Sequence, residues 1–176
     1  GSLYPVKGQT YILQAAPKIL NVFPDALFIF VGRGPCECSL KNEAINLGIS
    51  DRVRFLGFRN DVSDILKIVN VFISASLMES FSLSTVEAMA SGALVIASDV
   101  GAMKEIIEDS FDGMLVAAMD PIAIADKVIA VLGNDELVKK MSNNGFDKVK
   151  EKFALAIMLS KYAEIYYKTL EKKREK

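Results

Sequence analysis

Two glutamates that stand eight positions apart enclose a serine-rich stretch. It runs from Glu79 to Glu87 and reads Glu-Ser-Phe-Ser-Leu-Ser-Thr-Val-Glu. Apolar spacing predicts that a helix begins within it, and the amides of a first helical turn have no partner inside the helix. A diphosphate can bind such amides at the positive end of the helix dipole, and the small Ser82 and Ser84 would let it approach. An ionised carboxylate can accept hydrogen bonds from two vicinal hydroxyls. The pattern therefore favours a ligand that carries both phosphate and a diol.

Each glutamate also has a simpler structural explanation. Ser84-Thr85-Val86-Glu87 reads as a capping box, in which the Glu87 side chain would accept a hydrogen bond from the Ser84 amide. Taken alone, this sequence favours the cap. An isolated loop glutamate such as Glu79 is most often an exposed residue without a specific role.

Two further short segments have residue types that suit the same ligand. Gly32-Arg33-Gly34-Pro35 follows an apolar run and is typical of a strand-ending turn, which can also line a cleft. Lys7 precedes Gly8 near the start of the chain. A lysine is a flexible point charge that can bind a diphosphate, and an ordinary surface lysine is the alternative.

The elements that would position these residues alternate between strand and helix. Short apolar runs that end in glycine or polar residues predict strands at 27–31, 53–56, 71–74 and 94–97. Apolar residues three and four positions apart predict helices at 9–23, 37–47, 61–68, 84–91 and 101–108. This alternation predicts an α/β domain with a Rossmann-like open parallel sheet, helices on both faces and a ligand at the carboxyl ends of the strands.

Beyond a sheet core at about 3–118, the pattern becomes helical throughout. Three helices are predicted, at about 121–132, 135–150 and 153–172. The last one has an apolar stripe, which by itself is typical of a packed helix with a frayed basic end. The stripe consists of Leu155, Met158, Leu159, Tyr162, Ile165, Tyr166 and Leu170. With 176 residues, the chain is expected to form one domain, 1–176.

Composition narrows the classes of function. A net charge of -1 and a pI near 5.6 give no attraction for a polyanion, so we expect a small ligand and no nucleic acid. The absence of histidine excludes a histidine general base and a histidine metal ligand. Cys36 and Cys38 lack the second pair that a zinc site needs, so we expect reduced thiols and no metal. The sequence shows no signal peptide and no apolar run near the roughly 20 residues that span a bilayer, so a cytoplasmic location is expected.

Together, these segments resemble the donor-binding, carboxyl-terminal domain of retaining GT-B glycosyltransferases of family 4, also called glycosyl transferases group 1. Glu79 and Glu87 match the family's two glutamates separated by seven residues. The loop 32–35 matches its glycine-x-glycine-proline segment, and Lys7-Gly8 matches its lysine-glycine pair after the domain's first strand. The segments 51–57, 101–107 and 112–116 continue the match.

The resemblance implies a role for each matched residue. Glu79 would bind hydroxyls of the donor sugar and Lys7 the diphosphate, and these two would be the catalytic residues. Glu87 would accept hydrogen bonds from the ribose hydroxyls. The residues implied to bind the nucleotide sugar are Gly34, Arg54, Ser80, Phe81, Ser82, Leu83, Ser84 and Glu87.

The implied reaction moves a sugar, with retention of its anomeric configuration, from a nucleoside-diphosphate sugar to a glycan, lipid or polysaccharide acceptor. Lys7 and the amides near Ser82, Leu83 and Ser84 would stabilise the departing diphosphate, so no cofactor and no divalent metal are expected. The sequence has no Asp-x-Asp motif. The nucleobase, the sugar and the acceptor do not follow from these motifs.

The match also has departures. The family usually has an arginine in a Gly-Arg-Leu context where this chain has Gly1-Ser2-Leu3, so a second phosphate cation is missing unless Gly1-Ser2 is a remnant of tag removal. The amino-terminal acceptor domain has no counterpart here, and it would be the natural partner in a full-length enzyme with peripheral membrane association. Because the last helix crosses to that domain in the family, some rings of Tyr162, Tyr166 and Tyr167 are expected to be exposed.

Other functions use similar architectures. A dinucleotide-dependent dehydrogenase would need Gly-x-Gly-x-x-Gly, and Gly32-Arg33-Gly34-Pro35 does not continue that pattern. A nucleotide-sugar epimerase half would be expected to have a catalytic histidine, and the chain has none. A non-catalytic nucleotide-binding module remains an alternative.

Overall fold

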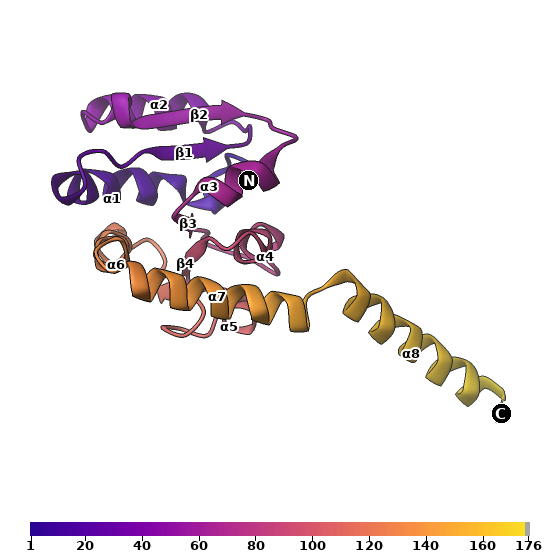
Figure 1. Cartoon of the computed structure of the whole chain (residues 1–176). Helices are drawn as coiled ribbons and strands as arrows, with labels where there is room; N and C mark the ends of the chain where they lie inside the picture. Colours follow the sequence, from indigo (N-terminus) through magenta and orange to yellow (C-terminus); the bar gives the residue numbers. More distant parts are fainter. Residues whose placement is uncertain (175–176) are drawn as a thin grey trace.

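The computed structural model describes residues 1–174, which form a layered α/β body followed by one long outlying helix (Figure 1). The strands are β1 (Phe28–Val31), β2 (Val53–Gly57), β3 (Val71–Ser74), β4 (Leu94–Ser98) and β5 (Met114–Val116). The helices are α1 (Gln9–Val22), α2 (Glu37–Asn46), α3 (Val62–Ile68), α4 (Leu83–Ala90), α5 (Met103–Ile106), α6 (Pro121–Leu132), α7 (Asp135–Lys152) and α8 (Leu155–Arg174), with short 3-10 helices η1 (Pro5–Lys7) and η2 (Ser50–Arg52). Every predicted strand and helix is confirmed, and β5 is an additional short strand.

The parallel strands with helices on both sides confirm the expected Rossmann-like α/β class, and the strands are divided into a two-stranded and a three-stranded sheet where one sheet was expected. β1 pairs with β2, and β4 lies between β3 and β5. The amino-terminal segment runs between the carboxyl ends of β1 and β3, where the Gly1 nitrogen donates to the Val31 carbonyl (2.7 Å) and the Leu77 amide donates to the Val6 carbonyl (2.8 Å). The resemblance implied a strand before Lys7, and among the described residues η1 stands there instead.

One of two apolar core clusters nevertheless serves both sheets. It combines buried residues of α1, β1, β4 and α6, among them Leu13, Ile19, Phe30, Ile96, Ile124 and Val128. A second cluster covers the other face of β4 and includes Val95, Ala97, Met103 and Ile106. Because both faces of β4 are covered and it has a neighbour on each side, all its residues are buried, as predicted for a central parallel strand.

The expected cover on both faces does not extend to β2. Val53 is buried and Phe55 stacks on Phe30 of β1, with ring centroids 5.1 Å apart. Arg54 and Leu56, which point to the opposite face, are exposed. This alternation is typical of an edge strand with one covered face.

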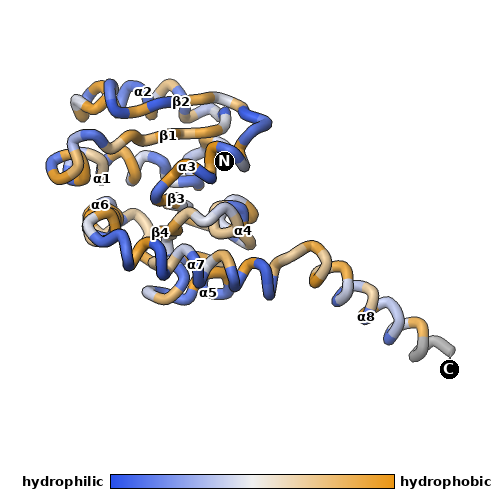
Figure 2. The backbone as a smooth tube through the Cα atoms, viewed as in Figure 1, coloured by the Kyte–Doolittle hydropathy of each residue, from blue (hydrophilic) through white to orange (hydrophobic). Residues whose placement is uncertain are grey.

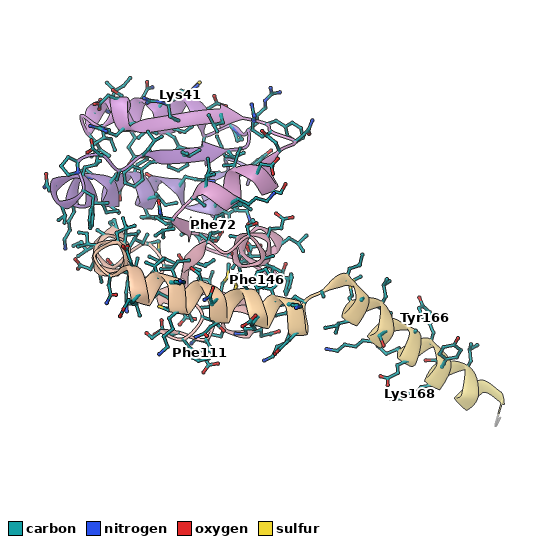
Figure 3. All side chains as sticks on the ribbon, in the orientation of Figure 1. Lys41, Phe72, Phe111, Phe146, Tyr166 and Lys168 are labelled. Atoms are coloured by element: carbon teal, nitrogen blue, oxygen red, sulfur yellow. The ribbon has the colours of Figure 1, made fainter. Side chains whose placement is uncertain are left out.

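Helix α8 extends away from the body (Figures 1 and 2). Figure 3 shows Tyr166 and Lys168 on this helix, apart from body residues such as Phe72. The side chains of its apolar stripe are exposed: Leu155, Met158, Leu159, Tyr162, Ile165, Tyr166 and Leu170. Tyr167, outside the stripe, is exposed as well, which confirms the expected exposure of the tyrosines. The interpretation of α8 as a packed helix is wrong, because the side chains of the stripe are exposed. In the same range, no helix is both long and apolar enough to cross a membrane.

Candidate functional site

The candidate residues gather at the carboxyl edge of the sheets, as the parallel topology predicts. The loop between β3 and α4 contains Ser76 and Glu79, and η1 brings Lys7 against it. The amino end of α4 follows directly after this loop. The charged groups and the helix terminus therefore share one edge of the molecule.

Lys7 and Glu79 form an ion pair, although 72 positions separate them in the sequence. Lys7 Nζ lies 2.6 Å from Glu79 Oε2, and the same oxygen accepts a hydrogen bond from Ser76 Oγ at 3.3 Å. The Lys7 and Glu79 side chains are 30% and 13% exposed, so the attraction between them is screened less than on an open surface. The interpretation of Glu79 as an ordinary exposed loop residue is therefore wrong.

The Glu79 backbone has a close neighbour in Gly101, which follows β4. Gly101 has φ +54°, and a Cβ at this position would collide with the Glu79 carbonyl oxygen. The loops after β3 and β4 are thus built against each other. Sequence reasoning identified Gly101 only as the start of a helix and missed Ser76, whose signal is a polar residue two positions after a strand.

The amino end of α4 has no side-chain cap. Ser82 is the N-cap residue and is buried, yet its hydroxyl accepts from the Thr85 hydroxyl at 2.9 Å and lies 3.3 Å from the Ser84 hydroxyl. The first-turn amides therefore keep their capacity to bind an anion. The capping-box interpretation of Glu87 is wrong, because the helix begins at Leu83 and Glu87 lies beyond its first turn.

Glu87 is exposed on α4 and lies within electrostatic reach of the amino terminus. Burial lowers the pKa of the Gly1 amino group below its usual 8.0, the Lys7 charge lowers it further, and the Glu87 carboxylate opposes both effects. Lys7 and Glu87 therefore both lie near Gly1 at this edge of the molecule.

The other predicted residues of this stretch lie at the surface. Ser80, Phe81 and Leu83 are exposed in the turn that enters α4. The Phe81 ring contacts Phe153 edge-on, with centroids 5.7 Å apart, which ties the turn to the carboxyl end of α7. This contact restrains the backbone whose amides form the candidate anion site.

Gly34 lies on the β1 side of the edge and packs against the amino-terminal segment. A Cβ on Gly34 would collide with the Leu3 carbonyl oxygen. The Leu3 amide donates to the Arg33 carbonyl at 3.0 Å, and the Leu3 carbonyl accepts from the Cys36 amide at 3.1 Å. Gly34 therefore helps to position the segment that carries Lys7.

Arg54 is the one predicted site residue that the structure does not bring to this edge. It is the second residue of β2, near the amino end of the strand. Its guanidinium donates to the carbonyls of Asp51 (2.9 Å) and Val53 (3.0 Å), so it folds back on its own backbone. Arg54 was expected to lie among the residues that bind the nucleotide sugar, and in the structure it lies near the other end of β2.

A shallow depression at the carboxyl end of β2 adds residues that the sequence analysis did not single out. Phe58, Arg59, Asn60 and Asp61 line it, and Phe58 is exposed. Arg59 donates to both carboxylate oxygens of Asp61, at 2.8 and 2.5 Å, and this pairing lowers the pKa of Asp61. The bidentate pair fixes the loop beside the Phe58 ring.

Comparisons with known proteins bear on the family and the fold of this chain. Residues 1–148 match the family described as glycosyl transferases group 1. N-acetyl-alpha-D-glucosaminyl L-malate synthase of Bacillus anthracis is 35% identical over 165 residues, which cover 94% of this chain and 43% of that protein. The carboxyl-terminal domain of LpcC, a group 1 family glycosyl transferase of Francisella tularensis, has a TM-score of 0.79 at 31% identity, covering 88% of this chain and 84% of that one. HepE of Anabaena in complex with UDP has a TM-score of 0.90 at 24% identity, covering 96% and 47%, a likeness that shows the fold.

The chain thus spans less than half of the Bacillus anthracis relative and most of the LpcC domain. The family match includes Lys7, Glu79 and Glu87, since all three lie within residues 1–148. The family match over residues 1–148, the 35% identical relative and the shared fold together show that the chain belongs to the glycosyl transferases group 1 family.

Proposed function

We propose that this chain binds a nucleoside-diphosphate sugar and is the donor half of a retaining glycosyltransferase. The observation that carries the proposal is the position of the Lys7–Glu79 pair beside the uncapped amino end of α4. A cation and free helix amides suit a diphosphate, and a shielded carboxylate suits sugar hydroxyls. The UDP in the HepE complex supports a ligand of this class.

Each group then has one part of the donor to bind. Glu79 accepts hydrogen bonds from hydroxyls of the sugar, and Glu87 accepts from the ribose hydroxyls. The depression with Phe58 offers an aromatic surface for the nucleobase at the same edge. The retention of anomeric configuration rests on the match of Glu79 and Glu87 to the family 4 motif.

Charge develops on the diphosphate as the bond to the sugar breaks. An ammonium group has three N–H donors, so Lys7 can donate to phosphate oxygens with those that Glu79 does not use. The amides at Leu83 and Ser84 add a fixed positive field, which needs no reorganisation during the reaction. We therefore propose that these groups neutralise the leaving diphosphate without a divalent metal. Equal affinity for the diphosphate with Mg²⁺ and with EDTA is expected, and a loss of binding in EDTA would contradict this point.

The acceptor is proposed to bind outside this chain. The chain spans 43% of the Bacillus anthracis relative, and the exposed stripe of α8 has the character of an uncovered interface. A second, amino-terminal domain would bind a glycan, lipid or polysaccharide acceptor and complete the cleft, with peripheral membrane association of the full-length enzyme. The 176-residue chain alone is expected to bind donor and to transfer no sugar.

Calorimetric titration of the chain with UDP, GDP and ADP, each alone and as its common sugar conjugates, tests the proposal. We expect one preferred base, and tighter binding of one sugar conjugate than of its bare diphosphate. Absence of binding for all of these ligands would overturn donor binding. Robust sugar transfer by the isolated chain would overturn the assignment of the acceptor to a second domain.

A further inference from the structure

The two carboxylate oxygens of Glu79 have different surroundings. Oε2 accepts from both Lys7 Nζ and Ser76 Oγ, at 2.6 and 3.3 Å. Oε1 accepts no hydrogen bond from residues 1–170, whose side chains the structure describes. One oxygen is therefore held by the protein, and the other is left to a ligand.

The two partners of Oε2 differ in their freedom to move. Lys7 has a long side chain that is 30% exposed, so its ammonium can turn toward another anion. Ser76 is 3% exposed and follows the buried Ala75, so its short hydroxyl stays where the loop after β3 places it. A buried hydroxyl that left the carboxylate would lose its hydrogen bond without access to water.

This difference matters when a donor binds. Under the proposed function, Lys7 donates to the diphosphate as well as to Glu79, and the phosphate charge weakens its interaction with Glu79. Ser76 is then the partner of Oε2 that the diphosphate does not compete for. A carboxylate held only by this shared ammonium would rotate more freely and lose its alignment with the sugar hydroxyls.

We propose that Ser76 is a positioning residue, which holds Oε2 of Glu79 so that Oε1 faces the donor sugar while Lys7 binds the diphosphate. The inference rests on the proposed function. It means that Ser76, which lies outside the segment 79–87, contributes to the preference for a sugar conjugate over the bare nucleoside diphosphate. Ser76 contacts Glu79 and acts only through it.

The Ser76→Ala variant tests this role when the affinities for the preferred nucleoside diphosphate and for its sugar conjugate are both measured by calorimetry. We expect the preference for the sugar conjugate to fall about five- to tenfold, because a hydrogen bond to a charged group is lost. Affinity for the bare diphosphate should change less than about twofold, since Lys7 and the α4 amides remain. Ser98→Ala is the matched control, because Ser98 is a buried serine like Ser76, lies at the end of the neighbouring strand β4, and its hydroxyl has no hydrogen-bond partner among the described residues. It should leave the preference unchanged.

Two further variants separate positioning from packing. Ser76→Thr and Ser76→Val introduce side chains of the same shape, and only threonine keeps the hydroxyl, so only threonine should retain the preference. In a Glu79→Gln background, Ser76→Ala should have no additional effect on the preference. A preference that survives in Ser76→Val, or an additional loss in the Glu79→Gln background, would overturn the inference. If the unaltered chain binds no nucleoside diphosphate, the proposed function itself fails and the inference fails with it.

Discussion

The sheet of β3, β4 and β5 and the sheet of β1 and β2 differ in burial and in what their loops supply to the site. β4 is buried on both faces, whereas β2 buries Val53 and exposes Arg54 and Leu56. The loops of the first sheet carry Ser76, Glu79 and Gly101, and the second sheet supplies the Gly34 loop. Ser76, Glu79 and Gly101 thus lie in loops of the more buried sheet, and the packing of that sheet restrains the backbone of these loops.

Lys7 belongs to neither sheet and connects the two. Its segment is bonded to the β1 side through Leu3 and to the β3 side through Val6, and its ammonium pairs with Glu79. The affinity of the candidate site for its ligand is therefore expected to depend on the position of this segment, residues 1–7, between the more buried and the less buried sheet.

The largest expected effect is on the free energy of unfolding. It is measured by replacing one isoleucine with alanine in each of the two sheets. Ile96→Ala in β4 removes a fully buried side chain from the shared core and is expected to cost about 2–5 kcal/mol. Ile29→Ala in β1 removes a half-buried side chain that belongs to neither core cluster, so a loss of roughly 1 kcal/mol is expected. Denaturant unfolding of both variants measures this. Equal losses would show that the two sheets are equally packed.

The next largest effect is expected at Lys7, in the segment that connects the two sheets. Lys7→Ala should weaken binding of the preferred nucleoside diphosphate about tenfold or more, because it removes the side-chain cation placed for the phosphates. Binding of the corresponding nucleoside should change less than about twofold. Calorimetry with both ligands gives the comparison, and equal small losses for the two would make Lys7 a bystander.

A smaller loss is expected from Glu87→Ala on α4. The side chain is exposed and forms no cap, so the melting temperature should stay within about 2 °C, while nucleotide affinity falls by about three- to tenfold. Circular dichroism and calorimetry measure the two quantities. A lower melting temperature with unchanged affinity would indicate a structural role for Glu87 and no contact with ribose.

Local pattern was sufficient to predict the elements and the edge where the site lies. The apolar run 94–97 is continuous because β4 is covered on both faces, and the alternation of strands with helices requires parallel strands. The family resemblance assigned Lys7 and Glu79 to one donor site, but their ion pair was not predicted, since no local signal connects residues 72 positions apart.

Other features depend on long-range pairing, which periodicity does not encode. The run 53–56 reads as an apolar strand, but in the structure the face of β2 that carries Arg54 and Leu56 is exposed, and the run itself does not show which face will be covered. Ser84 resembles an N-cap in sequence, whereas the turn from β3 starts α4 at Leu83 and makes Ser82 the cap residue. In both cases the packing of neighbouring elements decided between local alternatives of similar energy.

The smallest effect is expected from Arg54→Ala, which serves as a charge control for Lys7→Ala. Both substitutions remove one positive charge, so an effect of net charge alone would be the same for the two. Arg54 sits near the amino end of β2 with its guanidinium on the carbonyls of Asp51 and Val53, away from the loops that hold Glu79. At an ionic strength of 0.15 M, interactions between exposed charges are largely screened beyond about 8 Å. Nucleotide affinity should therefore change less than about twofold, and stability by no more than about 0.5 kcal/mol. Calorimetry beside Lys7→Ala at the same ionic strength measures this, and a loss as large as that of Lys7→Ala would show that the guanidinium leaves the backbone and contacts the nucleotide.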